Sequence, residues 1–348
     1  MSAHDPTAWN VSPVKLTRKD YVSDQDVRWC PGCGDYAILA QVQKVFADLQ
    51  IDRDRTVFVS GIGCSSRFPY YMNTYGLHSI HGRAPAIASG LKIARPDLDV
   101  WVVTGDGDGL SIGGNHFIHV MRRNVNLKVL LFNNRIYGLT KGQYSPTSEL
   151  GKRTPSTPLG STDPPINPAS VALGCGATFV ARTIDTEIEH LQQVIRRVAS
   201  HQGTAFVEIY QNCNVFNDGA FETFTEKATK PMHSLFVEQG KPLTFANGTK
   251  GICIKEMKPR VIDIGPDFSP NDCWIHDERD NFKASILVRL FGDPRQESAF
   301  PRPFGVFYVN DRATHEDKLG AQVKLAKEKK GLGDLDALLK GEHTWTIS

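Results

Sequence analysis

The chain has 348 residues, of which 40% are hydrophobic and 22% charged, and its formal net charge at pH 7 is +2. This composition is typical of a globular protein with one large domain and an extension. The balanced charge argues against nucleic acid or an anionic membrane surface as a partner. No export signal is recognisable and no stretch approaches the roughly 18 apolar residues of a membrane helix, so a cytoplasmic location is expected.

Short apolar runs rich in β-branched residues alternate with helical patterns along the first two thirds of the chain. Strands are predicted at residues 56–59, 100–103, 127–132 and 205–210, with a weaker one at 177–180. Helices are predicted at residues 36–49, 84–94, 115–123, 188–199 and 314–330. This alternation predicts an α/β fold with a doubly wound, mostly parallel sheet.

The pattern changes near residue 222, where Pro, Gly and charged residues begin to interrupt the apolar runs. Three parts are therefore predicted, namely an N-terminal arm at 1–19, a core domain at 20–221 and a C-terminal extension at 222–348. The extension either packs on the core or wraps a neighbouring subunit, and subunit contact is favoured.

Two polar motifs follow neighbouring predicted strands. Gly105-Asp106-Gly107 comes after one strand, and Asn134 comes after the next, 28 residues beyond Asp106. In such a sheet, ligands bind beyond the carboxyl ends of the strands. Glycines let backbone N–H groups approach a pyrophosphate, and hard oxygen ligands suit Mg²⁺. Asp108, two residues on, either caps the following helix or is a further ligand.

Four of the seven cysteines form a second pattern. Cys30 and Cys33 form a C-x-x-C pair, but no buried strand precedes it, so a thioredoxin dithiol is disfavoured. Cys64 and Cys213 follow predicted strands at the same sheet edge. Four thiolates fit tetrahedral zinc or a [4Fe–4S] cluster, and spacing alone does not separate these. An electron acceptor has a reason to lie beside a redox-active cofactor, so the cluster is favoured.

The motifs carry two resemblances. Gly-Asp-Gly with Asn-Asn resembles the signature of thiamine pyrophosphate enzymes, which implies the Asp106 and Asn134 side chains and the Ile136 carbonyl as Mg²⁺ ligands. The wider set resembles the β subunit of 2-oxoacid:ferredoxin oxidoreductases, nearest to the 2-oxoglutarate type. It consists of WCPGCG, GIGCSSR, HGRAPAIASG, TGDGDGLSIGG, FNNRIYGLTKGQ and EIYQNCNVFNDGAF.

This second resemblance implies oxidative decarboxylation of a 2-oxoacid, most closely 2-oxoglutarate, or the reverse reductive carboxylation. The reaction would use thiamine pyrophosphate, Mg²⁺ and coenzyme A. Electrons would pass singly through a [4Fe–4S] cluster on Cys30, Cys33, Cys64 and Cys213 to ferredoxin. A separate α subunit would supply the activating glutamate and cover the aminopyrimidine ring, giving an α2β2 assembly, so the chain alone should be inactive.

Site residues follow from the same resemblance. His81 and Arg67 are predicted to be catalytic, His81 near the thiazolium or substrate and Arg67, or Arg83, against a substrate carboxylate. The alternatives are a packing histidine and structural arginines. The predicted cofactor contacts are Ile62, Gly63, Cys64, Ser65, His81, Gly105, Asp106, Gly107, Asn134, Ile136, Gly138, Leu139 and Thr140.

Two other functions compete with this interpretation. One is a non-redox thiamine-dependent decarboxylase whose cysteines hold a structural zinc. The other is a scaffold subunit that binds no cofactor, which the Asp106 and Asn134 pair argues against. The sequence leaves open which 2-oxoacid is used and in which direction the reaction runs.

Overall fold

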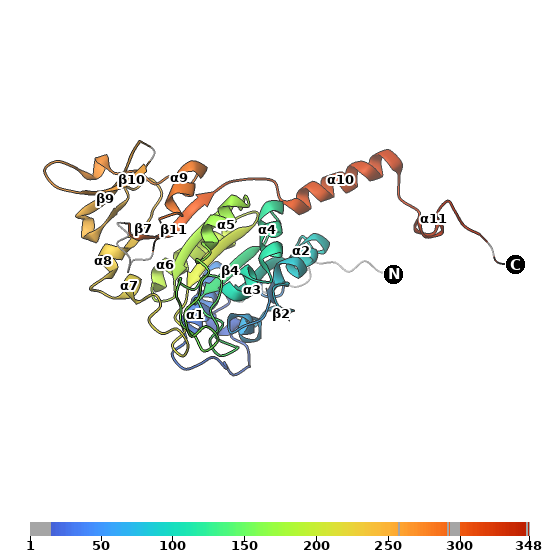
Figure 1. The fold of residues 1–348 in the computed structure, drawn as a ribbon. Helices are drawn as coiled ribbons and strands as arrows, with labels where there is room; N and C mark the ends of the chain where they lie inside the picture. Colours follow the sequence, from blue (N-terminus) through green and yellow to red (C-terminus); the bar gives the residue numbers. More distant parts are fainter. Residues whose placement is uncertain (1–14, 257, 291, 293–299, 346, 348) are drawn as a thin grey trace.

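The computed structural model describes residues 15–256, 258–290, 292, 300–345 and 347 (Figure 1). Most of the predicted N-terminal arm therefore lies outside the described residues. Within them, the central feature is an eight-stranded sheet with the order β2-β1-β3-β4-β6-β5-β11-β7. A second, three-stranded sheet has the order β10-β9-β8.

The strands of the central sheet are β1 (Thr56–Ser60), β2 (Tyr75–His78), β3 (Asp99–Gly105), β4 (Lys128–Asn133), β5 (Phe179–Ile184), β6 (Ala205–Tyr210), β7 (Ser234–Phe236) and β11 (Arg302–Val309). The first six are mutually parallel, whereas β11 runs antiparallel to β5. The small antiparallel sheet consists of β8 (Thr244–Phe245), β9 (Lys250–Lys255) and β10 (Lys258–Asp263).

The longer helices of the body are α1 (Asp35–Leu49), α2 (Ala84–Ala94), α4 (Gly114–Arg123), α5 (Pro168–Gly174), α6 (Ile188–Ser200) and α9 (Asn281–Leu287). Short helical turns are η1 (Arg18–Tyr21), η2 (Ser65–Tyr71), α3 (Asp106–Leu110), α7 (Glu222–Thr225), α8 (Lys230–His233), η3 (Ala246–Gly248) and η4 (Pro270–Asp272). Four predicted strands and all five predicted helices are confirmed, and α2 begins and ends at the predicted residues. The weaker strand predicted at 177–180 overlaps β5 only in its last two residues, because β5 begins at Phe179.

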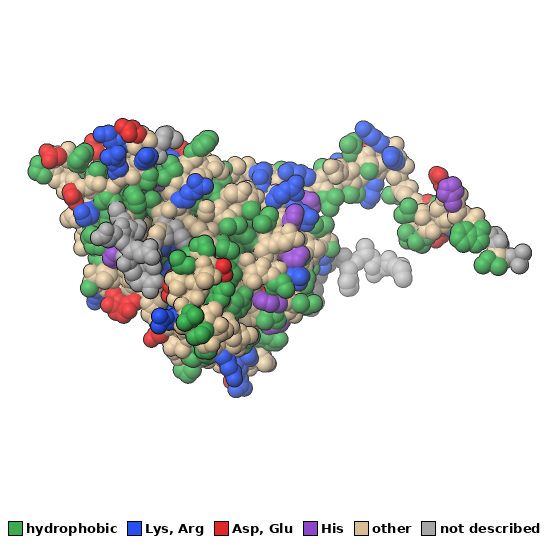
Figure 2. Space-filling view, in the orientation of Figure 1, with side chains coloured by type: hydrophobic (Ala, Val, Ile, Leu, Met, Phe, Trp, Pro, Cys, Tyr) green, Lys and Arg blue, Asp and Glu red, His purple; other side chains and the backbone are tan. Residues whose placement is uncertain are grey.

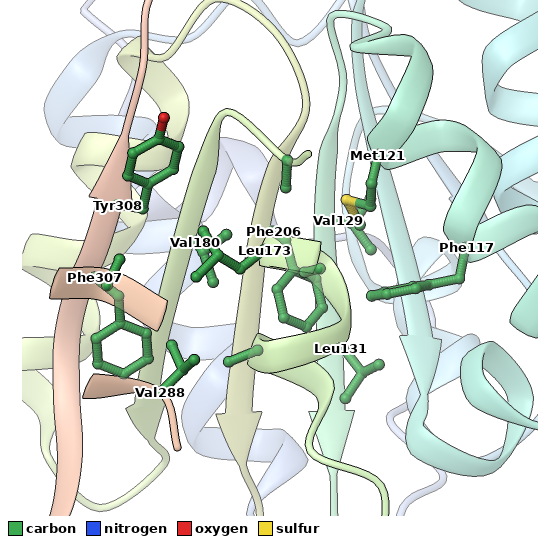
Figure 3. Packing of buried hydrophobic residues seen from close by; sticks show 14 of the residues in the cluster. Phe117, Met121, Val129, Leu131, Leu173, Val180, Phe206, Val288, Phe307 and Tyr308 are labelled. Atoms are coloured by element: carbon green, nitrogen blue, oxygen red, sulfur yellow. The ribbon is translucent and has the colours of Figure 1, made fainter. Parts of the chain in front are cut away.

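Both faces of the central sheet are covered, which explains why its strands read as continuous apolar runs. Alternate residues of β3 point to opposite faces, so Val102 joins one buried cluster and Trp101 the other. The first cluster includes residues of α2, α4 and α5, and the second includes residues of α1 and α6. Figure 3 shows Phe117 and Met121 of α4 packed over strand residues that include Val129.

Strand β11 was not predicted, although all eight of its residues are buried. Its sequence begins with Arg302-Pro303, and a proline argues against a central strand. The proline is tolerated near the start of the strand, where β11 pairs with the short strand β7. Residues beyond 222 thus contribute two strands to the central sheet, while the predicted domain boundary itself stays a prediction.

The C-terminal arm consists of α10 (His315–Lys330) and α11 (Leu335–Lys340), which project from the body (Figure 1). Helix α10 begins at a capping box in which Thr314 and Asp317 bond reciprocally. Hydrophobic side chains are exposed along this arm (Figure 2), among them Leu332, Leu335, Leu338, Leu339 and Trp345. Within the described ranges, none of the helices combines the length and hydrophobicity needed to cross a lipid bilayer.

Candidate functional site

Strands β1, β3, β4 and β6 are neighbours in the sheet, so the polar loops that follow them meet at one edge. Two adjoining cavities lie there. The glycine cavity is lined by Asp35, Ile62, Gly63, Cys64, Ser65, His81, Gly105, Asp106, Gly107, Asp108, Phe132, Asn134, Ile136, Tyr137, Gly138, Leu139, Thr140 and Gln211. The cysteine cavity is lined by Arg28, Trp29, Cys30, Cys33, Cys64, Arg67, Asn134, Gly138, Leu139, Lys141, Gln211, Cys213, Asn214 and Phe216.

The structure therefore brings all thirteen predicted cofactor contacts to the glycine cavity and all four predicted cluster ligands to the cysteine cavity. The roles of these residues stay predictions. Five residues line both cavities, so the two share a wall: Cys64, Asn134, Gly138, Leu139 and Gln211. A group bound in one cavity would lie next to a group bound in the other.

Asp106 is buried at the end of β3, and two hydroxyl groups hold its carboxylate. Ser145 Oγ and Thr147 Oγ1 donate to the same oxygen, Oδ2, at 2.5 and 2.6 Å. The other oxygen, Oδ1, receives neither hydroxyl. Burial raises the pKa of Asp106 to about 6, although the two hydroxyl groups act in the opposite direction. A bound cation would favour the ionised form.

Asn134 and Ile136 lie in the turn after β4. Asn134 Oδ1 accepts from the Ile136 N–H at 3.2 Å, which leaves a second lone pair on this oxygen. Arg135 between them has φ +56°, so the chain reverses there. In the described residues, no three His, Cys, Asp or Glu side chains converge on one metal-ion position. The predicted Mg²⁺ set contains only one such side chain, Asp106, and its oxygen donors fit this ion.

The glycines of this cavity are required for two different reasons. Gly63 has φ +128°, a conformation that side chains rarely adopt. Gly107 lacks space for a side chain, because a Cβ atom there would lie 2.2 Å from the Tyr137 ring. The hydroxyl of Tyr137 donates to the Gly107 carbonyl at 3.0 Å, which fixes the ring against the loop. Backbone therefore lines the cavity closely, as a pyrophosphate site requires.

Asp108 is buried and orients His81. Its carboxylate lies 2.6 Å from His81 Nδ1 and accepts from the Gly82 N–H at 2.7 Å. It also accepts from the Ile62 N–H at 3.0 Å and from Thr104 Oγ1 at 2.6 Å. The carboxylate places the proton of His81 on Nδ1, so Nε2 is the acceptor nitrogen. In the described part of the chain, Nε2 has no protein partner.

Four donors satisfy the Asp108 carboxylate, so this residue is no metal ligand in the present arrangement. The expectation that it caps the following helix is also wrong. Asp108 lies inside α3, and the residue before α4 that takes the cap position is Gly113. The sequence pattern misled here because a short separate helical turn follows β3.

Hydrogen bonds tie together the three loops of the cysteine cavity. Trp29 Nε1 donates to the Cys64 carbonyl at 2.6 Å. Asn214 Nδ2 donates to the Pro31 carbonyl at 2.6 Å. The tryptophan of the C-x-x-C motif thus connects the pair to the loop after β1, and the loop after β6 closes on it from the other side. These contacts explain how residues far apart in sequence line one cavity.

Gly138 leaves open space between two of the four thiols. A Cβ atom on Gly138 would lie 3.6 Å from Cys213 Sγ and 3.7 Å from Cys64 Sγ, so a side chain there would fill the space between two thiols. Burial raises the pKa of Cys64 to about 12 and raises that of Cys33 as well. Iron or zinc would reverse this effect, because metals bind the thiolate form.

The structure separates the two arginines of the sequence-based prediction. Arg67 lines the cysteine cavity rather than the glycine cavity, and its Nε donates to the Tyr71 hydroxyl at 3.0 Å. Arg83 lines neither cavity, and its Nη1 donates to the Ile112 carbonyl at 3.2 Å. A structural role for Arg83 accounts for this contact, and the catalytic role of Arg67 stays a prediction.

Sequence reasoning missed several residues of the site. Asp35 lines the glycine cavity with both carboxylate oxygens buried, and the neighbouring Cys33 thiol interacts with them. Gln211 lines both cavities and directly follows β6, so the rule that sites lie at strand ends could have found it. Ser145 and Thr147 belong to a long loop without a periodic pattern, and no sequence signal indicates their contact with Asp106.

Fold and site together define a thiamine pyrophosphate-binding α/β protein. The family model described as the C-terminal TPP-binding domain of thiamine pyrophosphate enzymes matches residues 61–209. The chain is 49% identical to the 2-oxoglutarate oxidoreductase subunit KorB of Mycobacterium tuberculosis, over 94% of this chain and 88% of that protein. It is 47% identical to the β subunit of an Aeropyrum pernix 2-oxoacid:ferredoxin oxidoreductase, over 55% of this chain and 60% of that protein.

A solved structure is similar to this chain in both fold and sequence. The 2-oxoglutarate:ferredoxin oxidoreductase from Magnetococcus marinus, with 2-oxoglutarate, coenzyme A and succinyl-CoA bound, matches with a TM-score of 0.73 and 34% identity, covering 94% of this chain and 95% of that chain. The chain belongs to the β subunits of 2-oxoacid:ferredoxin oxidoreductases. This membership supports the redox interpretation over the non-redox decarboxylase.

Proposed function

We propose that the chain is the β subunit of a 2-oxoglutarate:ferredoxin oxidoreductase. Thiamine pyrophosphate and Mg²⁺ bind in the glycine cavity, and a [4Fe–4S] cluster binds in the cysteine cavity. The observation that carries this proposal is the wall that the two cavities share. A one-electron acceptor must lie close to the cofactor that it oxidises, whereas a structural zinc has no reason to lie there.

When bound, thiamine pyrophosphate supplies the nucleophilic carbon for decarboxylation of a 2-oxoacid, and the cluster accepts single electrons. The chain's own residues hold and orient these groups. Asp106, Asn134 and the Ile136 carbonyl hold Mg²⁺, and Cys30, Cys33, Cys64 and Cys213 hold the cluster. Their donor types match hard and soft metals respectively.

His81 is the proposed acid–base group of the glycine cavity. Asp108 fixes the ring through Nδ1 and leaves Nε2 to accept or return a proton. Three peptide and hydroxyl donors on the same carboxylate keep it in place, so the ring does not swing freely. The packing alternative for His81 does not explain why its side chain is 39% exposed and lines the cavity.

A partner subunit is part of the proposal. No glutamate lines the glycine cavity among the described residues, whereas thiamine enzymes need one to activate the aminopyrimidine ring. Exposed apolar side chains lie next to His81 in the chain and on the cavity edge, with Ile80 71% and Leu139 53% exposed. An α subunit that brings the glutamate would cover them. We therefore propose an α2β2 enzyme of the cytoplasm that uses coenzyme A and an external ferredoxin.

The test is to purify the chain with its α partner without air and to measure iron, visible absorption and activity. Reduction of a viologen dye is assayed with coenzyme A and a panel of 2-oxoacids, and 2-oxoglutarate is expected to give the highest rate. A colourless, iron-free preparation that releases CO₂ without reducing the dye would instead identify the non-redox decarboxylase. Activity with another 2-oxoacid alone would contradict the substrate assignment.

A further inference from the structure

We propose that Gln211 tunes the reduction potential of the metal centre in the cysteine cavity by donating a hydrogen bond to Cys33. This inference rests on the proposed function, because it takes the centre to be a [4Fe–4S] cluster. Gln211 would act through its cysteine partner and is a positioning residue rather than a catalytic one.

The geometry places the amide of Gln211 between the two cavities. Its Nε2 lies 3.2 Å from Cys33 Sγ, and the side chain is 1% exposed. The backbone N–H of Gln211 donates to the Asn133 carbonyl at 2.9 Å, which continues the pairing of β6 with β4. Nε2 also donates to the Asn212 carbonyl at 2.5 Å, so the amide group is held in this orientation. The residue is thus fixed at both ends.

The contact is unlike the surroundings of the other three sulfur atoms. Among the described residues, no side chain donates a hydrogen bond to the sulfur of Cys30, Cys64 or Cys213, whereas Cys33 receives one. Three cationic side chains line the same cavity, but none of their nitrogen atoms bonds to sulfur; they are Arg28, Arg67 and Lys141. The Gln211 amide is therefore the amide side chain that contacts the ligand set, beside the backbone N–H and the carboxyl group of Asp35, which also interact with Cys33.

A donor at a ligating sulfur stabilises the reduced state, which carries one more negative charge, and so raises the reduction potential. Gln211 itself is buried, where a hydrogen bond to a charged group is worth more than in water. Because Gln211 lines both cavities, its amide lies between the two proposed binding sites. A higher potential there favours electron transfer from the cofactor.

Two substitutions remove the donor in different ways. Gln211→Leu removes the amide, and Gln211→Glu keeps its size but replaces the donor with a carboxylate. Gln43→Leu is the matched control, because Gln43 is 2% exposed and its Nε2 donates at 3.1 Å to the carbonyl of Tyr71 rather than to a sulfur atom. All variants are made in the αβ complex and purified without air.

The measurement is a dye-mediated redox titration followed by EPR of the reduced cluster. Q211L is expected to shift the reduction equilibrium toward the oxidised state by roughly tenfold, which corresponds to 59 mV for one electron. Q211E shifts it further in the same direction, and Q43L leaves it at the wild-type value. Unchanged potentials in both Gln211 variants would overturn the inference.

A second measurement uses only the wild-type complex, so it tests the inference even if the Gln211 variants lose the cluster. Pulsed EPR in H₂O and D₂O is expected to detect an exchangeable proton coupled to the reduced cluster, and its absence would overturn the inference. A wild-type complex without iron would overturn the proposed function and this inference with it. An intact cluster without the proton overturns this inference only, so the two failures are distinguishable.

Discussion

The glycine cavity and the cysteine cavity share a wall but are built differently. In the glycine cavity, Asp108 accepts from four donors and Asp106 from two hydroxyls, so the protein itself fixes these two carboxylates. In the cysteine cavity, the described sulfur atoms receive a single side-chain donor, from Gln211. On the proposed function, this difference means that the first cavity is organised before its ligand binds, whereas the second would be completed by a metal group.

The largest effect is expected for Cys213→Ala. The variant should lose the [4Fe–4S] cluster, because one of four thiolates is missing, and viologen reduction should fall to background. Iron analysis and EPR of the dithionite-reduced protein measure this. Thiamine pyrophosphate binding in the αβ complex should survive, since the glycine cavity has its own hydrogen bonds.

Cys175→Ala is the control for that experiment, because Cys175 lines neither cavity. An unchanged cubane in the Cys213 variant would refute the ligand assignment. If the variant lost both the cluster and thiamine pyrophosphate binding, the two cavities would not be organised independently, and the contrast drawn between them would be wrong.

Asp106→Ala tests the other cavity. The substitution removes the only carboxylate of the predicted Mg²⁺ set, so Mg²⁺-dependent binding of thiamine pyrophosphate to the αβ complex should be abolished in calorimetry. The iron content should stay at the wild-type level. Asp163→Asn, which removes an exposed carboxylate at the Tyr144 hydroxyl, is the control. A wild-type dissociation constant in the Asp106 variant would count decisively against the site.

Asp108→Asn should reduce turnover on the order of 100-fold, because the His81 ring loses the partner that fixes its proton. The pH profile of viologen reduction separates this from general damage. Loss of an oriented base displaces the profile, whereas a merely structural defect lowers the rate equally at every pH. A parallel, unshifted profile would therefore contradict the proposed role of His81.

Thr147→Val should weaken Mg²⁺ affinity by roughly tenfold, as expected when a group that orients a metal ligand is removed. Thr147 Oγ1 lies 2.6 Å from Asp106 Oδ2 and 2.8 Å from Asn133 Oδ1. Titration with Mn²⁺ followed by EPR measures the affinity directly. Thr56→Val is the matched control, because Thr56 is also buried but bonds to the Asp52 carbonyl. Equal affinities in both variants would show that the glycine cavity needs no such support.

The smallest effect on the site is expected from substitution of His190, because this residue lines neither cavity. Its titration instead affects the pH dependence of the protein's stability. Burial lowers the pKa of His190 from 6.5 to about 4, with Lys230 adding to the shift and Glu187 opposing it. His190 therefore becomes protonated near pH 6.5 in the unfolded chain but only near pH 4 in the folded protein. The free energy of unfolding should decrease as the pH falls through this range.

Denaturant unfolding at pH 7 and pH 5 measures the effect, which for this residue is at most about 2 kcal/mol. His190→Asn should reduce the difference between the two pH values. Buried Asp35 and Asp106 have raised pKa values and act with the opposite sign, so the difference between wild type and variant is the informative quantity. An identical pH dependence in both proteins would contradict the assignment.

Much of the fold could be predicted because the strands are buried on both faces. Continuous apolar runs such as residues 127–132 predict a strand from local sequence alone. Six strands escaped prediction, namely β2, β7, β8, β9, β10 and β11, and two of them did so for opposite reasons. Strand β2 lies at the edge of the sheet with all four residues exposed, so it has no apolar signature. Strand β11 is buried, but its Arg302-Pro303 start conceals it.

The sequence by itself determined the alternation of strands and helices, the oxygen donors after β3 and β4, and the placement of Cys64 and Cys213 at the sheet edge. These follow from residue type and from the rule that parallel strands end at a common edge. Only the tertiary structure decided that Asp108 holds His81, that Thr147 reaches Asp106 and that Gln211 bonds to Cys33. Such contacts depend on which loops become neighbours and on side-chain directions, and local sequence specifies neither.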